Sequence, residues 1–183
     1  NWMLLEKKEY EISGIVVSLG EMMKYAISRS SRTVALREEI RHVSNYLLIQ
    51  KERMEDKLEY EIDIPHQYES VQVPRLILQP LVENAIVHGL EPRRGLGSVA
   101  VRLWEETQNI CVRIEDDGVG FDPENLDLAR EVESAGQHNH IALTNVLRRL
   151  HLLYGDRADL QIRSKPGQGT TVLLTLPLDQ TKG

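Results

Sequence analysis

The chain has 183 residues, enough for one compact domain with a helical extension. Its net charge of −6 argues against a general nucleic-acid binder, although a nucleotide needs only a local positive pocket. No apolar run approaches the roughly 20 residues that span a bilayer. The single cysteine, Cys111, excludes an intrachain disulfide, and its apolar neighbours predict a buried thiol in a reducing compartment.

Helical spacing of apolar residues predicts two helices at the start of the chain. The first extends to about Ser31, and its apolar stripe is wide enough to pack against both a second helix and a second subunit. The second helix extends to about Glu55, with Thr33 as its N-cap. Two antiparallel helices with a short turn form an αα-hairpin. We assign residues 1–56 to this hairpin and residues 57–183 to a separate domain.

The rest of the chain alternates strands with helices. Residues 58–64 alternate apolar and acidic side chains, which predicts a strand with one solvated face. The other predicted strands are 98–104, 109–115, 160–164 and 170–176, with a helix over 141–154. The order β-α-ββ-α-ββ predicts an α/β fold, a two-layer sandwich of a mixed sheet and helices. Residues 122–139 have no clear period and predict a loop around a short helical piece, of a kind that is often functional.

The stretch Leu78–Leu90 sorts its residues by face when it is read as a helix. Pro74 suits its first turn, whereas Pro80 lies further in and predicts a kink or a frayed turn. An adjacent acid and amide on the polar face can hold Mg²⁺ or orient its waters, although the same pattern occurs on ordinary solvated helices. The apolar face carries Leu78, Leu81, Val82, Ala85 and Gly89, and the polar face carries Glu83, Asn84 and His88.

A second polar stretch follows the strand that ends near Glu115. It reads Asp116-Asp117-Gly118-Val119-Gly120. An acid at a strand end with two glycines after it lets the backbone turn sharply and approach a ligand closely. The plain alternative is a strand that ends in a turn.

These two stretches, in this order, resemble the N box and the G1 box of the GHKL ATPases, which include sensor histidine kinases, DNA gyrase, Hsp90 and MutL. Residues 78–89 are most similar to the LytS/YesM type of sensor histidine kinase, and residues 34–52 resemble the segment before its ATPase domain. The resemblance spans nearly the whole chain. It implies the Bergerat fold, and it implies that residues 1–56 are the remainder of a dimerisation and phosphoacceptor region without its acceptor histidine.

The resemblance also implies a role for each residue of the two boxes. Asn84 matches the residue that holds the Mg²⁺ bridging the triphosphate of ATP, and Glu83 matches the acid that acts as a base or positions the reacting group. His88 matches a position near the phosphates. Asp116 matches the acid that accepts a hydrogen bond from the adenine amino group, a charge-assisted bond.

Further nucleotide contacts are implied on both sides of the predicted loop. Gly118 and Gly120 let the chain pass around the base, and a hydroxyl of Thr170 or Thr171 would reach adenine through water, although Thr171 also suits a plain strand. The second glycine box of the family, Gly-Ile-Gly-Leu, is altered here, so we expect nucleotide binding to persist with weaker affinity or with a lid that orders differently. Its Ala142 costs roughly 1–2 kcal/mol if φ is positive and is favourable if helical. The free backbone N–H groups at the N-terminus of this predicted helix can still donate hydrogen bonds to a phosphate. The box comprises His140, Ile141, Ala142 and Leu143; Arg148 and Arg149 are expected to be solvated or remote from the phosphates.

The function implied is that of the ATP-binding catalytic portion of a two-component sensor histidine kinase. It would transfer the γ-phosphoryl of Mg·ATP to a histidine upstream of this fragment, for relay to a response regulator. We expect a homodimer in the full-length protein, a cytoplasmic location in a membrane-anchored bacterial sensor, and no nucleic-acid partner. The alternatives are another GHKL ATPase or a nucleotide-responsive dimerisation module without catalysis.

The chain begins at Asn1 without an initiator Met, so we expect a fragment of a longer protein. The family places its acceptor in an Asn-Pro-His-Phe-like box. None of the six histidines lies in such a box, so we predict that this portion does not phosphorylate itself. His42, on the second helix, is expected to be a surface or hairpin-contact residue.

Overall fold

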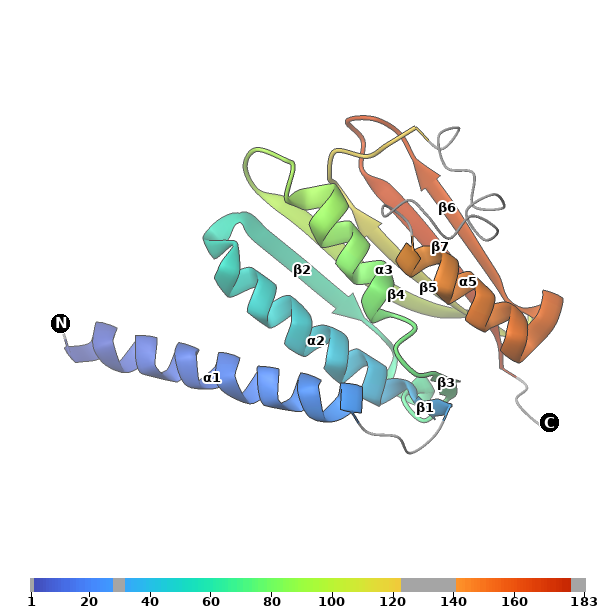
Figure 1. Cartoon of the computed structure of the whole chain (residues 1–183), viewed down its shortest axis with the longest axis horizontal. Helices are drawn as coiled ribbons and strands as arrows, with labels where there is room; N and C mark the ends of the chain where they lie inside the picture. Colours follow the sequence, from blue (N-terminus) through green and yellow to red (C-terminus); the bar gives the residue numbers. More distant parts are fainter. Residues whose placement is uncertain (1, 28–31, 123–140, 179–183) are drawn as a thin grey trace.

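The computed structural model describes residues 2–27, 32–122 and 141–178 of the chain (Figure 1). A five-stranded sheet has the order β2-β4-β5-β7-β6; β2 and β4 are parallel, and the other neighbours are antiparallel. Figure 1 shows α2, α3 and α5 over one face of this sheet, which confirms the predicted two-layer α/β sandwich. The strands are β2 (Leu58–Asp63), β4 (Gly97–Glu106), β5 (Asn109–Asp116), β6 (Asp159–Ser164) and β7 (Thr170–Pro177).

Burial along the strands follows their side-chain alternation. In β2, and in β4 as far as Trp104, every second residue is buried or half-buried; the residues between them are exposed in β2 and half-buried or exposed in β4. β5 is buried at most positions because it lies in the middle of the sheet, and Cys111 is among its buried side chains as predicted. The largest buried side chains of the helices pack on this face and form one continuous core with the strands.

The helical hairpin consists of α1 (Trp2–Ile27) and α2 (Leu36–Arg53), which lie side by side in opposite directions (Figure 1). Asn45 of α2 donates a hydrogen bond to Glu21 of α1 at 3.1 Å. Several large apolar side chains of α1 are exposed, so its packing against a second subunit stays a prediction. They are Ile12, Val16, Val17, Leu19, Met23 and Ile27. None of the helices in the described ranges is long and apolar enough to cross a membrane.

The connection between the two helices differs from the prediction. Thr33 is not a helix cap, because Thr33–Ala35 forms a short strand, β1, paired antiparallel with β3 (Gln72–Pro74). Helix α2 begins at Leu36 without a side-chain cap. Its first N–H groups instead donate to backbone carbonyls before β3, Leu36 to Val71 at 2.7 Å among them. Pro74 correspondingly belongs to β3 and not to the central helix.

The central helix has two parts, α3 (Gln79–Asn84) and a π-helical turn, η3 (Ala85–Leu90). The predicted apolar face is confirmed, since it is buried from Leu78 to Gly89. The predicted kink at Pro80 is wrong, because the helix begins at Gln79. Pro80 therefore lies in the first turn, where a helix makes no use of the missing N–H.

The remaining helical element, α5 (Ile141–Tyr154), has the predicted bounds, and Gly155 follows it with φ +58°. The loop predicted over residues 122–139 lies outside the described residues apart from Asp122. Three short 3₁₀ turns complete the fold: η1 (Glu55–Lys57), η2 (His66–Tyr68) and η5 (Gly155–Arg157).

Candidate functional site

A pocket lies where the central helix, the ends of β5 and β7, and the start of α5 meet. Its cavity measures about 50 Å³ and its lining is mostly apolar. Six of the predicted site residues line it, which brings together parts of the chain that are far apart in sequence. The lining comprises Leu81, Asn84, Ala85, His88, Gly89, Ile114, Asp116, Gly120, Phe121, Leu143, Ile162, Thr170 and Val172.

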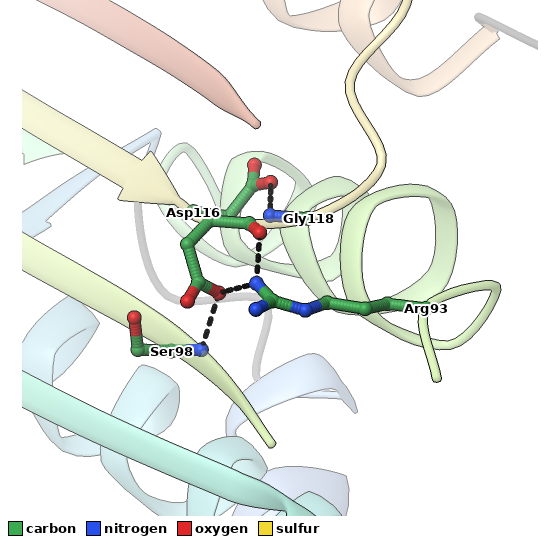
Figure 2. Close-up of polar contacts among 5 residues, drawn as sticks. Arg93, Ser98, Asp116 and Gly118 are labelled. Carbon is green, nitrogen blue, oxygen red and sulfur yellow. Dashed lines mark hydrogen bonds and ion pairs between the residues drawn. The ribbon is translucent and has the colours of Figure 1, made fainter. Parts of the chain in front are cut away.

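Asp116 is the only acidic residue in this lining, and its side chain is buried, with 6% of the residue exposed. Its Oδ1 accepts a hydrogen bond from the backbone N–H of Gly118 at 2.9 Å (Figure 2). Burial raises the pKa of Asp116 to about 6. Backbone N–H groups of Gly118 and Thr170 oppose this rise, and the charges of Asp117 and Glu115 add to it. An acid with a raised pKa in a pocket is a candidate for binding or chemistry.

Two glycines allow the central helix to touch the turn after β5. A Cβ on Gly89 would lie 2.6 Å from Oδ1 of Asp116, and a Cβ on Gly118 would overlap the backbone of Gly89. Val119 N–H also donates to the carbonyl of Gly89 at 2.9 Å. Gly89 therefore belongs to the site, although its place on the apolar helix face predicted only a core position.

The Asp117 side chain is held on the outside of the same turn. Its Oδ1 accepts the Ser98 N–H at 2.7 Å and forms an ion pair with Arg93 at 2.8 Å (Figure 2). Arg93 also donates to the Asp117 carbonyl. Asp117 is not part of the pocket lining, so it anchors the turn that carries Asp116. Sequence reasoning missed Arg93, because a charged residue in a polar loop has no distinguishing signal.

The polar side chains of the central helix point to two places, the pocket and the helical hairpin. Asn84 and His88 line the pocket, and the Nδ2 atom of Asn84 is buried without a hydrogen-bond partner among the described residues. Glu83 is exposed and outside the lining. The pKa of Tyr46 on α2 is raised first by burial and second by the negative charge of Glu83. Glu83 is therefore close enough to α2 to act on it, and it lies toward the helical hairpin.

Of the other residues predicted to contact the nucleotide, Gly120 and Thr170 line the pocket and Thr171 does not. Gly120, at φ +60°, lines the pocket and passes close to the carbonyl of Lys165, where a Cβ would clash. Thr170 also lines it, and its hydroxyl lies 2.9 Å from the Ser164 hydroxyl. Thr171, opposite Glu115 in the sheet, is outside the lining.

The altered glycine box is only partly described. Leu143 lines the pocket, whereas His140 lies outside the described residues. Ile141 and Ala142 have helical backbones at the start of α5, so the cost of a left-handed Ala142 does not apply.

Of the two alternatives predicted for the arginines of α5, solvation holds for Arg148 and is wrong for Arg149, whose distance from the phosphates stays a prediction. Arg149 is half-buried and donates to the carbonyls of Arg75 and, at 3.2 Å, Leu76. His42 is buried and contacts both neighbours of α2, since its ring stacks on Tyr25 and its Nε2 hydrogen-bonds the Gln79 side chain.

Comparison with known proteins identifies this arrangement. Residues 70–180 match the family described as histidine kinase-, DNA gyrase B- and HSP90-like ATPase, and residues 1–58 match the histidine kinase family. The match to an ATPase domain implies that the chain binds ATP. It also accounts for a pocket between the helical layer and the ends of β5 and β7.

Two curated relatives are sensor kinases. The sensor histidine kinase YesM of Bacillus subtilis is 32% identical over 97% of this chain and 30% of its own length. The sensor protein kinase HptS of Staphylococcus aureus is 30% identical over 91% of this chain and 32% of its own length. The chain thus spans about a third of the length of these relatives.

Solved structures share the fold. The histidine kinase domain of a blue-light activated histidine kinase from Erythrobacter litoralis has a TM-score of 0.60 at 19% identity, covering 93% of this chain and 76% of that one. The histidine kinase AdeS of Acinetobacter baumannii has a TM-score of 0.54 at 17% identity, covering 97% and 83%. The chain therefore belongs to the histidine kinase-, DNA gyrase B- and HSP90-like ATPase family, and its first 58 residues match the histidine kinase family.

Proposed function

We propose that the pocket binds Mg·ATP, with Asp116 as the acceptor for the adenine amino group. The observation that carries this proposal is a buried carboxylate with acceptor sites to spare. An ionised carboxylate offers about four acceptor sites. Asp116 uses one for the Gly118 N–H, and the backbone N–H of Thr170 also stabilises its charged form. Guanine presents a carbonyl where adenine presents the amino group, so the acid selects adenine.

The nucleobase requires the pocket to widen. The cavity of about 50 Å³ is below the roughly 300–1,000 Å³ of typical ligand pockets. The residues available for that movement include Phe121 and Leu143, which border the pocket from the turn after β5 and from α5. The backbone at Gly118 and Gly120 would pass around the base, and the hydroxyls of Thr170 or Thr171 would reach it through water.

The phosphates and the metal would lie along the central helix. The amide of Asn84 has a buried nitrogen without a partner among the described residues, and amide nitrogen and oxygen exchange places by a rotation. Turned one way, Asn84 presents an oxygen to Mg²⁺; His88 would lie near the phosphates. The described residues contain no cluster of three or more acids, histidines or cysteines suited to a metal. Phosphate oxygens and water would therefore supply most ligands of the Mg²⁺.

The same domain would transfer the γ-phosphoryl group to a histidine outside this chain. The position of Glu83, toward the helical hairpin and outside the pocket, supports a role for this acid in that reaction. Transfer would rest on positioning and charge neutralisation. We further propose a response regulator as the next acceptor, a homodimer in the longer protein, and a cytoplasmic position in a membrane-anchored sensor. Residues 1–56 would be the remainder of the dimerisation region and 57–183 the catalytic domain, with His140, Ile141 and Ala142 near the phosphates.

The test is a calorimetric titration with ATP, ADP and GTP. We expect ATP and ADP to bind and GTP to bind much more weakly. Asp116→Ala removes a hydrogen bond to a charged group, about 1.5–3 kcal/mol, or roughly 10- to 150-fold in affinity. Equal binding of GTP, or unchanged ATP binding by a folded Asp116→Ala variant, would refute the adenine assignment.

A further inference from the structure

The segment between β3 and α3 is held in an unusual backbone conformation. Leu76 has φ +53°, in the left-handed region that residues other than glycine seldom adopt. Such a conformation persists only where its surroundings over-determine it, and it occurs often at functional sites. This segment leads directly into the helix that carries Asn84.

One buried carboxylate binds the N–H side of the segment. Glu39 of α2 is fully buried, and its two oxygens accept the backbone N–H groups of Leu76 at 2.6 Å, Ile77 at 2.9 Å and Leu78 at 3.1 Å. A buried charge is tolerated only when it is hydrogen-bonded in this way. Glu39 therefore supplies partners to three consecutive N–H groups, the last of them on Leu78, the N-cap residue of α3.

The carbonyl side of the segment is bound from the opposite direction. Arg149 of α5 donates to the carbonyls of Arg75 and Leu76. α5 also contributes Leu143 to the pocket. The segment thus connects α2, the central helix and α5, the three helices that lie over the sheet (Figure 1).

Helix α1 reaches the same carboxylate. The hydroxyl of Tyr25 donates to Oε1 of Glu39, the oxygen that also accepts the Leu76 N–H. The centroid of the Tyr25 ring lies 4.5 Å from the centroid of the His42 ring and 4.5 Å from Cζ of the Arg75 guanidinium. Burial, foremost, together with the hydrogen bond to Glu39, raises the pKa of Tyr25 above its usual range, so its hydroxyl stays a donor.

We infer that Glu39 is a positioning residue for the nucleotide site and that Tyr25 makes this positioning depend on α1. Glu39 sets the backbone of residues 76–78, which sets the first turn of α3 and hence the place of Asn84. A displacement of α1 removes one of the four donors to Glu39 and loosens the segment. The inference rests on the proposed Mg·ATP site only where it concerns affinity, since the backbone effect is independent of any ligand.

The experiment compares Tyr25→Phe with the matched control Tyr68→Phe. Tyr68 also donates its hydroxyl to a carboxylate, Glu105 at 3.0 Å, but at the surface and away from the site. Hydrogen exchange without nucleotide is followed at the amides of residues 76–78. We expect faster exchange there in Tyr25→Phe, unchanged exchange in Tyr68→Phe, and similar unfolding midpoints for both variants.

Affinity for Mg·ATP then tests the link to the site. Tyr25 acts on the site only through Glu39, so part of the free energy of its hydrogen bond reaches the site, and we expect Tyr25→Phe to bind about three- to tenfold more weakly than the wild type. The double variant Tyr25→Phe/Asn84→Ala should lose less than the sum of the single losses, because both act through Asn84. A purely structural role of Tyr25 predicts additive losses.

The outcomes separate the two proposals. Unchanged exchange at residues 76–78 in folded Tyr25→Phe overturns the positioning inference, as do additive losses in the double variant. A wild type that binds no nucleotide refutes the proposed function, and the exchange result alone then decides whether Glu39 and Tyr25 hold the segment. Glu39→Gln provides a second variant, since it keeps the size of the side chain but removes its charge and one acceptor oxygen.

Discussion

At the residue scale, the burial of one side chain, Asp116, gives the pocket its acidic group. The end of β5 carries Glu115, Asp116 and Asp117 in succession, yet only Asp116 lines the pocket. Glu115 is exposed, and Asp117 is engaged by Arg93 and by the backbone at Ser98. Alternation along the strand and the turn after it therefore bring one of three adjacent acids into the pocket.

The raised pKa of Asp116 predicts a pH dependence of nucleotide binding. With a pKa of about 6, the carboxylate is ionised above that pH, where it would accept the adenine amino group, and it takes up a proton as the pH falls through about 6. The affinity of the wild type should then fall by up to about tenfold for each pH unit below that value. The loss belongs to the acidic side because the protonated acid gives up its charge-assisted bond.

Calorimetric titrations with Mg·ATP between pH 5 and pH 8 measure this dependence. Asp116→Asn is the control, since its side chain does not titrate and the variant shares every protonation of the nucleotide itself. Equal slopes of affinity against pH for the two proteins would show that Asp116 does not face the base.

At the element scale, the central helix changes from an α-helix to a π-helical turn, and each part contributes a different residue to the pocket. The α-helical part presents Asn84 to the pocket, and the π-helical turn that follows brings Gly89 against Asp116. π-turns often occur at functional sites. The backbone contact between Gly89 and Gly118 leaves no space for a side chain at either position.

Gly89→Ala is therefore expected to displace the Asp116 side chain and to weaken Mg·ATP binding at least tenfold, with some loss of stability. Gly14→Ala is the matched control. It lies in α1 with no described atom within 4 Å of an added Cβ, so alanine should stabilise that helix by up to about 1 kcal/mol. Thermal unfolding and calorimetry measure both effects; wild-type affinity in Gly89→Ala would contradict the close contact.

Asn84 should act through the metal. We expect Asn84→Ala to weaken ATP binding when Mg²⁺ is present and to change it little in EDTA, because the phosphates then have no ion to share with the amide. Asn109→Ala, at the start of β5 and bound to the Thr107 carbonyl at 3.3 Å, is the control and should change neither value. An equal loss in both conditions would disprove the metal role.

At the scale of the whole molecule, the hairpin and the nucleotide site form one packed unit. β1 pairs with β3, and α2 supplies Glu39 to the start of the central helix. A change in the hairpin therefore reaches the site through buried hydrogen bonds and not through a flexible linker. The two family matches end at residue 58 and begin at residue 70, yet described residues of both share one core, so the boundary near residue 56 stays a prediction.

This chain is predicted not to phosphorylate itself. Phosphoryl transfer requires donor and acceptor within about 3–3.5 Å, and none of the six histidines lies in the box expected for the acceptor. Incubation with radiolabelled ATP should leave no acid-labile, base-stable label on the chain. A longer chain that contains an Asn-Pro-His-Phe-like box should become labelled.

Label on the chain itself would show that the acceptor has been misplaced. Absence of label on the longer, folded chain with intact ATP binding would instead favour a nucleotide-responsive module without catalysis.

The sequence by itself determined the five strands of the main sheet, most of the helices, the fold and the two motifs of the site, but not the strands β1 and β3. These features depend on local patterns, namely alternation in β2, the apolar face from Leu78 to Gly89, and the acid and glycines from Asp116 to Gly120. A side-chain period of 2 or 3.6 residues follows from backbone geometry, so it can be recognised without knowledge of the partner.

Only the tertiary structure decided which residues complete the site and hold it in place. Thr33 pairs in a strand where its residue type suggested a cap, and Gly89 faces Asp116 where its spacing suggested plain core. Glu39 and Arg149 bind one segment from opposite sides although they lie 110 residues apart in the sequence, and neither belongs to a motif. The physical reason is that a hydrogen bond between distant segments depends on where the chain brings its donor and acceptor, and no local pattern records that position.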